Sequence, residues 1–183
     1  VLPNNTWTNI GSHTSPCPPV SGCTDSTALN YDPTATIDDG SCCISQIWIQ
    51  MSNFIDTGRH HPITFSNNNY GFVMSGSYLT DVYRYSKSND SWTKLQDIPF
   101  SGRGYAYGVA VGDKAYMGFG LTSNGLLPTD WWEYDMNNNT WLQKSSFPSN
   151  GRLHPAMVVV NNKIYMGCGN NNNGNLGDWW EYD

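Results

Sequence analysis

The sequence predicts an all-β protein, and three observations support that prediction. Residues that favour turns are abundant, with 21 Asn, 18 Gly and 10 Pro, whereas the strong helix formers Ala, Leu, Glu and Lys number only 6, 10, 2 and 5. Short runs of β-branched and aromatic residues lie between these turns. The same succession of runs and turns recurs along most of the chain. This composition argues against a helical bundle.

Charge and hydropathy exclude further classes of protein. The formal net charge is −6 and only 13% of the residues are charged, so the chain lacks the charge excess of disordered proteins. The 9 basic residues are scattered among 15 acidic ones and form no stripe that could follow a phosphate backbone, so we expect no nucleic acid partner. No apolar run approaches the ~20 residues that span a bilayer. We therefore expect a folded protein that does not span a membrane.

The N-terminal part of the chain concentrates cysteine. After a linker of residues 1–16, a segment of residues 17–43 is dense in Pro, Ser, Thr and Asp and contains Cys17, Cys23, Cys42 and Cys43. Such a segment has little apolar material for a core, so disulfides are expected to hold it together. A zinc site is the competing interpretation, but no cysteine pair has the C-x2-C spacing. The most economical scheme pairs Cys23 with Cys42 and Cys17 with Cys43. Because disulfides persist in oxidising surroundings, their presence favours a location outside the cell or at its surface.

Three copies of one template follow from Ile47 onward. Each copy has a Trp, a Gly-Arg pair 10 residues later, a Gly 18 residues after that pair, and an Asp that opens a later strand. Only the interval from the last Gly to the Asp varies, at 5, 10 and 9 residues. The template positions are Trp48, Trp92 and Trp141; Gly58-Arg59, Gly102-Arg103 and Gly151-Arg152; Gly76, Gly120 and Gly169; and Asp81, Asp130 and Asp178.

Each period contains four strand-like runs separated by short turns. In the second copy these runs are Tyr105 to Val111, Lys114 to Phe119, Asp130 to Tyr134 and Thr140 to Lys144. A four-stranded antiparallel meander repeated every 44 to 49 residues is typical of propeller blades. The first run, Ile47 to Met51, aligns with the fourth strand of a blade. The sequence of residues 47–183 therefore predicts enough strands for three blades. The three repeats are residues 47–90, 91–139 and 140–183.

A closed propeller typically needs four to eight blades. Three blades cannot close alone, so we expect either a fragment of a longer propeller protein or half of a six-bladed ring built by two chains.

The repeats resemble the kelch family. The matching motifs are Tyr116 to Gly120 and Tyr165 to Gly169, Asp130 to Tyr134 followed by Trp141, and Arg152 with His154, which is one residue tighter than the family's Arg-x-x-His. They are especially similar to kelch repeats of secreted proteins from Bacteroidota-type bacteria. The resemblance covers Ile47 to Asp183 and implies a kelch-type β-propeller. Some kelch enzymes resembling galactose oxidase place Tyr, His and a cross-linked Cys on the propeller axis, and no set here aligns with theirs.

The cysteine-rich segment contains the runs Gly22 to Asp25, Ala28 to Pro33 and Ala35 to Cys42. With these runs it resembles a short Asp-rich module bounded by cysteines, which is found in secreted proteins of the same bacteria. It carries five oxygen donors in a small loop, and Ca2+ takes six to eight oxygens from such flexible surroundings. The donors are Asp25, Asn30, Asp32, Asp38 and Asp39. Calcium is therefore the one cofactor that we consider. In the alternative interpretation these side chains form Asx-turns without metal, and the spacing is not that of an EF-hand.

Several recurrent side chains are interpreted as architecture. His60, His61 and His154 follow the Gly-Arg pairs at homologous points of two repeats, which favours a structural role over a single active centre. The three arginines of the template are expected to anchor neighbouring blades by hydrogen bonds to carbonyl groups.

Two further groups of side chains are assigned to the interior. Trp131, Trp132, Trp179 and Trp180 could stack on sugars, but alternation along a strand turns at least one of each pair toward a blade interface, so we expect core positions. Cys168 aligns with Phe119 and Ser75 and is expected to be a buried free thiol.

All length variation among the copies falls in the loops between the second and third strands. Successive turns of a meander alternate between its two ends, so these loops share one face with the Gly-Arg segments, and insertions confined to one face often mark a binding surface. The predicted binding residues are Leu121, Thr122, Ser123, Asn124, Asn170, Asn171, Asn172 and Asn173.

The sequence thus predicts a non-catalytic binding or adhesion scaffold outside the cell, with a glycan or a surface protein as its partner. The alternatives are part of a secreted carbohydrate enzyme, either oxidase-like or epimerase-like, and a self-assembling subunit of a surface fibre.

Overall fold

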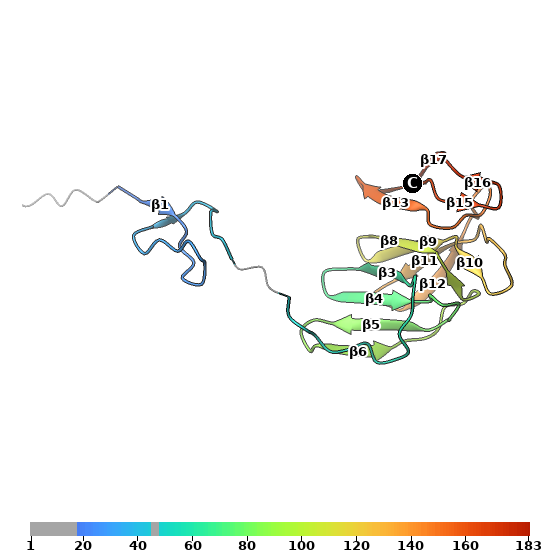
Figure 1. Ribbon diagram of the computed structural model, residues 1–183, viewed down its shortest axis with the longest axis horizontal. Coiled ribbons are helices and arrows are strands. Elements are labelled where there is room, and N and C mark those ends of the chain that lie inside the picture. The colour runs from blue at the N-terminus through green and yellow to red at the C-terminus, as the bar shows by residue number, and fades with distance from the viewer. Residues whose placement is uncertain (1–17, 45–47) are drawn as a thin grey trace, which may run out of the picture. The chain divides into compact units, whose positions relative to one another are not determined.

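The computed structural model describes residues 18–44 and 48–183 (Figure 1). The chain divides into two compact units, Val1–Gln50 and Met51–Asp183. Every regular element in the described residues is a β-strand, as the sequence predicts. Within these residues, no helix is long and apolar enough to cross a lipid bilayer.

In the described part of the first unit, one disulfide and two short strands hold the chain together. Its two short strands, β1 (Ser21–Gly22) and β2 (Ile37–Asp38), pair in parallel. The Cys23–Cys42 disulfide links residues whose Cα atoms lie 4.7 Å apart. Cys23 and Ala28 are its buried apolar side chains. Because the apolar interior is so small, loop closure by the disulfide, worth about 3 kcal/mol for a loop of this length, is a major stabilising contribution.

The second predicted disulfide involves a residue outside the described range. Cys17 lies there, and Cys43 is exposed and pairs with none of the described cysteines. The pairing of Cys17 with Cys43 therefore stays a prediction.

The three larger antiparallel sheets of the second unit each have the form of a propeller blade. Blade 1 contains β3 (Ile63–Ser66), β4 (Tyr70–Met74), β5 (Val82–Ser86) and β6 (Ser91–Lys94). Blade 2 contains β8 (Tyr107–Val111), β9 (Lys114–Gly118), β11 (Trp131–Asp135) and β12 (Thr140–Lys144). Blade 3 contains β13 (Ala156–Val160), β14 (Lys163–Gly167) and β17 (Trp179–Tyr182).

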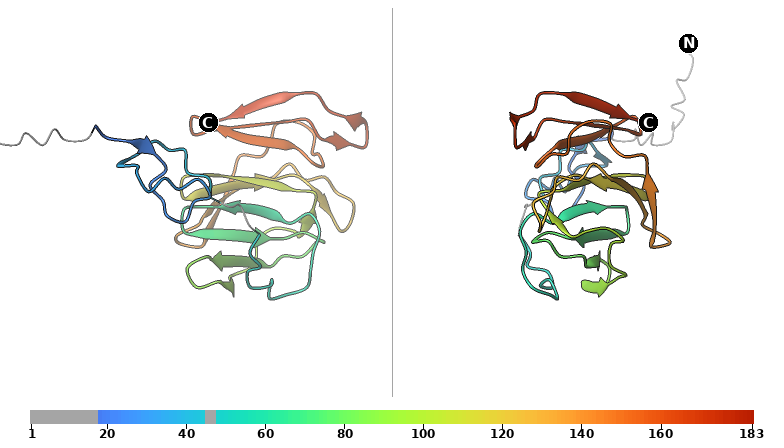
Figure 2. Two further views of the ribbon diagram at one scale, coloured as in Figure 1. Left: turned by 60° about the vertical axis from the view of Figure 1, so that its left-hand side comes forward. Right: turned by 90° about the vertical axis from the view of Figure 1, so that its right-hand side faces the viewer.

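Blade 2 stands between the other two. Its first strand, β8, contacts β3 of blade 1 and β13 of blade 3, and Figure 2 shows the three sheets in this order. Alternation along β9 serves both interfaces, because Ala115 and Met117 join the core shared with blade 1 while Tyr116 packs against the core shared with blade 3. Among the described residues, the blades do not close into a ring.

Short strands lie on the loop side of the blades. β7 (Arg103–Gly104) pairs with β10 (Leu121–Thr122), and β15 (Asn170–Asn171) pairs with β16 (Gly174–Asn175). The first pair joins the Gly-Arg segment of blade 2 to that blade's long loop. The bridge between Leu153 and Asn170 makes the equivalent connection in blade 3.

The structure corrects the prediction of a strand at Ile47 to Met51. Ile47 lies outside the described residues, and Trp48 to Met51 form no strand. A fourth strand exists only when it can pair with the third strand of a blade, and blades 1 and 2 already contain their own fourth strands, β6 and β12.

Two interior assignments are also corrected. Cys168 is exposed rather than buried, because Ser75 and Phe119, its counterparts, are each covered by the following blade. Of the tryptophans assigned to the core, Trp131 is buried and Trp132 is half-buried, but Trp179 and Trp180 are 53% and 38% exposed. Trp180 lies in a hollow that it shares with Phe119 and Trp131 of blade 2, where it packs against Phe147 but is only partly covered.

Candidate functional site

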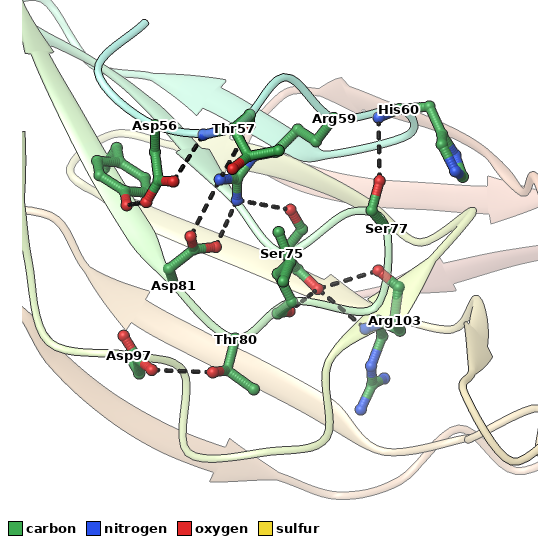
Figure 3. Close-up of polar contacts among 12 residues, drawn as sticks. Asp56, Thr57, Arg59, His60, Ser75, Ser77, Thr80, Asp81, Asp97 and Arg103 are labelled. Atoms are coloured by element: carbon green, nitrogen blue, oxygen red, sulfur yellow. Dashed lines mark hydrogen bonds and ion pairs between the residues drawn. The ribbon is translucent and has the colours of Figure 1, made fainter.

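An arginine and an aspartate form the same ion pair in each blade and fix the start of the first strand. The Arg103 guanidinium donates two hydrogen bonds of 2.9 Å to the Asp130 carboxylate and one of 3.1 Å to the Phe119 carbonyl. Arg152 contacts Asp178 at 2.7 and 2.8 Å in the same way. Figure 3 shows the third example, Arg59 with Asp81.

The backbone of the same segment connects neighbouring blades. The Gly76 N–H of blade 1 donates to the Arg103 carbonyl of blade 2 at 3.0 Å, and the Gly120 N–H of blade 2 donates to the Arg152 carbonyl of blade 3 at 2.9 Å. The Ser75 hydroxyl adds a further bond to the Arg103 carbonyl (Figure 3). The predicted anchors thus bond to carbonyls, but the hydrogen bonds of the Arg103 and Arg152 side chains stay within their own blades, and the hydrogen bonds to the neighbouring blade are made by their peptide groups.

In blades 2 and 3, the glycine of the Gly-Arg pair admits the loop of the preceding blade. A Cβ on Gly102 would lie 2.1 Å from the Tyr78 carbonyl oxygen, and one on Gly151 would lie 2.0 Å from the Leu127 carbonyl oxygen. Neither contact is sterically possible, so glycine is required at both positions. Gly58, the equivalent in blade 1, has no described atom within 4 Å of such a Cβ.

The ion pairs lower the pKa values of their carboxyl groups. The hydrogen bonds from Arg152 lower the pKa of Asp178 to about 2, with a further bond from the Trp180 indole. Burial opposes ionisation of Asp130, yet the bonds from Arg103 still hold its pKa below the usual value. Both aspartates are therefore ionised at neutral pH.

The second residue after each arginine is an aromatic ring on a strained backbone. His61, Tyr105 and His154 have φ angles of 51°, 60° and 50°, in the left-handed region that glycine and asparagine adopt most readily. The imidazole of His61 lies 5.3 Å from that of His154, and the Tyr105 ring lies 4.3 and 4.9 Å from them, measured between ring centroids. Three blades thus place one ring each in a single cluster.

His60 extends this cluster, which we call the His–Tyr cluster (His60, His61, Tyr105 and His154). Its Nδ1 lies 2.8 Å from Nδ1 of His61, so one of these nitrogens donates to the other. Packing and the neighbouring His60 and His154 lower the pKa of His61. His61 is therefore neutral at pH 7 and can accept or donate a hydrogen bond.

Two hollows lie beside the cluster and the long loops. One, of about 340 Å³, lies between blades 1 and 2 and is lined by His61, Pro62, Thr64, Ala106, Tyr107 and Gly108. The other, of about 240 Å³, is lined by amide side chains and by Leu127 and Gly151. Its amide residues are Asn150, Asn171, Asn172 and Asn173.

The predicted binding residues take different roles. Asn171, Asn172 and Asn173 line the second hollow, and Ser123 and Asn124 are exposed. Thr122 is buried and structural, because its hydroxyl accepts from the Leu126 N–H. Leu121 and Asn170 pair with the Gly-Arg segments through their backbones.

The Asp-rich loop of the first unit consists of local turns. Asp25 accepts bonds from the Thr27 N–H and hydroxyl at 2.8 and 2.7 Å, and Asp32 does the same with Thr34. Asp38 and Asp39 accept from the N–H groups of Gly40 and Ser41, and Asn30 accepts from that of Cys43. Within residues 18–44 and 48–183, no three His, Cys, Asp or Glu side chains are grouped to hold a metal ion. Calcium binding stays a prediction, and the Asx-turn geometry is present.

Sequence reasoning did not foresee that the histidines meet. It assigned them to separate blades as architecture, and Tyr105 was not singled out. The available signal was positional, because all three clustered rings stand two residues after a template arginine. The template also contained the aspartate partner of each arginine, and Asp81 and Asp130 both precede the next template Trp by 11 residues.

The fold and its contacts define a β-protein built from propeller blades. The solved structure of YjhT is similar to it, with a TM-score of 0.57 and 25% sequence identity. The match covers 64% of this chain and 36% of YjhT, so the chain spans about a third of that protein. No family model and no curated protein matches the sequence.

Proposed function

We propose that the protein binds carbohydrate through the face that carries the His–Tyr cluster and the Asn-lined hollow. The observation that carries the proposal is the convergence of His61, Tyr105 and His154 from three blades. Non-glycine residues at such φ angles cost of order 1 kcal/mol or more each, and that strain is most often found at functional sites. Aromatic rings offer apolar faces for stacking on a sugar ring, and their polar atoms remain available for hydrogen bonds.

The neighbouring loops provide the complementary polar groups. Asn171, Asn172 and Asn173 present amide donors and acceptors, which match the hydroxyl groups of a neutral ligand. The bridge between Leu153 and Asn170 places this loop directly beside the segment that carries His154. The disulfide of the first unit suits an oxidising compartment, where cell-surface glycans are found. The resemblance of the repeats to secreted kelch proteins points the same way.

Glycan-array screening followed by calorimetry of the strongest ligand tests the proposal. His154→Asn and Tyr105→Asn remove one ring each, and asparagine tolerates the left-handed backbone. Each substitution should weaken binding roughly tenfold or more, because a stacking ring contributes about 1.4 kcal/mol or more. Asn172→Ala should weaken it further, whereas Asn137→Ala, in the turn between β11 and β12 at the opposite end of blade 2, should have no effect. Absence of glycan binding by the folded protein would contradict the proposal.

A second candidate function is catalysis on carbohydrate. The observation in its favour is the close contact of three imidazoles, of which His61 is held neutral and could act as a general base. Incubating the best-bound glycan with the protein and following it by NMR distinguishes the two. Conversion that is lost in His61→Asn would support an enzyme, and an unchanged spectrum would leave binding as the function.

A further inference from the structure

The loop between β4 and β5 of blade 1 has an unusual backbone. Four consecutive residues, Ser75 to Tyr78, have φ angles of 53°, 78°, 46° and 65°, all in the left-handed region. Residues with a Cβ visit this region singly, because it brings the Cβ close to the following carbonyl oxygen. Only Gly76 lacks a Cβ, and the last of the four is a bulky aromatic residue. The run therefore carries strain that the surrounding structure must hold in place.

The equivalent loops of the other blades share only the first half of this run. Blade 2 has positive φ angles at Phe119 and Gly120, and blade 3 has them at the two equivalent residues. In both blades the chain then enters a short strand, β10 or β15. Ser77 and Tyr78 stand where these strands begin. The additional strain is therefore specific to blade 1, and the form of the blade does not require it.

Docking of the blades does not explain this strain either. The carbonyl group of Tyr78 fills the space left by Gly102 of blade 2, where a Cβ would lie 2.1 Å from its oxygen. In the next pair of blades, the carbonyl group of Leu127 does the same at Gly151. The φ angle of Leu127 is not positive. An ordinary backbone can therefore make this contact, and the left-handed turn must have another role.

The strained turn carries the Tyr78 side chain to the edge of the His–Tyr cluster. The Ser77 N–H donates to the His60 carbonyl at 3.2 Å, and the His60 N–H donates to the Ser77 hydroxyl at 3.3 Å (Figure 3). The Tyr78 ring lies against Gly104, with Cε1 3.8 Å from the place of a Cβ on that glycine. Gly104 directly precedes Tyr105. Tyr78 therefore adjoins two members of the cluster, His60 through Ser77 and Tyr105 through Gly104.

The Tyr78 side chain remains accessible in this position. The residue is 39% exposed, whereas Tyr83 and Tyr134 are buried in the blades. An accessible tyrosine offers an apolar ring for stacking and a phenolic hydroxyl for hydrogen bonding, and a sugar unit can use both. The loop from Ser75 to Thr80 contains no charged residue, so its character matches a neutral sugar.

We propose that Tyr78 is a second aromatic contact of the carbohydrate site, and that the ligand is a neutral oligosaccharide rather than a single sugar. This inference rests on the proposed function. One sugar unit lies on the His–Tyr cluster, and a neighbouring unit of the same oligosaccharide lies on Tyr78. The hydrogen-bonded turn fixes the backbone of Tyr78 before the ligand arrives, which reduces the entropy that binding must remove.

Calorimetry of the full chain with two probes tests the proposal. The probes are the neutral oligosaccharide that binds most strongly on the glycan array and the best-bound of its constituent monosaccharides. Tyr78→Asn removes the ring and introduces a residue that tolerates the left-handed backbone. It should raise the dissociation constant of the oligosaccharide roughly tenfold and leave that of the monosaccharide unchanged. His154→Asn should weaken the binding of both probes, and Leu142→Asn, at an exposed leucine on β12, should weaken neither.

Urea denaturation adds a measurement that needs no ligand. Because a left-handed backbone strains tyrosine more than asparagine, Tyr78→Asn should leave the unfolding midpoint unchanged or raise it. A lower midpoint would overturn the proposal, because the ring would then be held for the stability of the fold.

The binding results separate this inference from the proposed function. Weaker binding of the oligosaccharide alone in Tyr78→Asn supports the second contact. Equal weakening of both probes, or an effect on neither, overturns it while carbohydrate binding itself stands. If no array glycan binds to the folded protein, the proposed function fails and this inference fails with it.

Discussion

Replacing Asp130 with asparagine isolates the contribution of the ion pair in blade 2. The Arg103 side chain is 1% exposed and that of Asp130 is 21% exposed, so the guanidinium cannot turn toward water when the carboxylate is lost. The substitution keeps the shape of the side chain but removes one acceptor and the negative charge. The buried cation then retains one side-chain oxygen at position 130 and the carbonyls of Phe119 and Ser101 as acceptors, but no negative charge.

The expected cost is about 3 kcal/mol. Removing one partner of a buried ion pair typically costs 3–5 kcal/mol, and the partial exposure of Asp130 places this pair at the lower end. A unit of this size has a free energy of unfolding of about 7–20 kcal/mol, so the variant should still fold. Urea denaturation followed by circular dichroism should show a lower midpoint with an unchanged slope.

The matched comparison uses an exposed pair. Glu181→Gln breaks the contact of Lys163 with Glu181, whose side chains are 37% and 44% exposed, and should cost less than about 1 kcal/mol. Asp178→Asn should fall between the two, because Asp178 is 33% exposed while its partner Arg152 is buried. If Asp130→Asn cost no more than Glu181→Gln, the inference that the buried arginines depend on their aspartates would be refuted.

Three further predictions concern redox state, acid and calcium. Reduction of the Cys23–Cys42 disulfide should abolish hydrogen-exchange protection in residues 18–44 and leave that of the blades unchanged; equal loss in both would contradict their independence. The pKa of Asp178 is about 2 in the folded protein, below its ordinary value of 3.8, so its contribution to stability is complete above about pH 4 and is lost as the pH falls through 2. Asp178→Asn should therefore flatten the acid denaturation profile over that interval, and an unaltered profile would argue against the assignment. If calcium binds the Asp-rich loop, a calcium titration should raise the melting temperature of the first unit, and Asp38→Ala should remove that rise. A melting temperature that does not change with calcium would mean that these side chains form Asx-turns without metal.

The strands of the blades could be predicted because local pattern and packing agree. The run Lys114 to Phe119 became β9 with only its last residue lost, since Phe119 adopts a positive φ of 65° and leaves the strand. The alternation of side chains that predicted this strand also sends one set of side chains toward blade 1 and the other toward blade 3.

Features that depend on contacts with other strands or other blades could not be predicted from the local sequence pattern. Trp48 to Met51 match a fourth strand in sequence, but a strand also needs a partner, and sequence alone does not supply one. The His–Tyr cluster depends on how three blades are placed around a common side, which no single repeat encodes.

The joint between blades relies on peptide groups, and this has an evolutionary consequence. Gly76 and Gly120 donate to the carbonyl of the next arginine through backbone N–H groups, which every residue except proline possesses. A newly duplicated repeat could thus form the same peptide hydrogen bonds to the neighbouring blade, without matching changes in the side chains of the two blades. Selection could then act on the outer loops independently in each copy, as the unequal lengths of Ser77 to Thr80 and Leu121 to Thr129 suggest. A protein built in this manner can diversify its surface loops at nearly constant architecture.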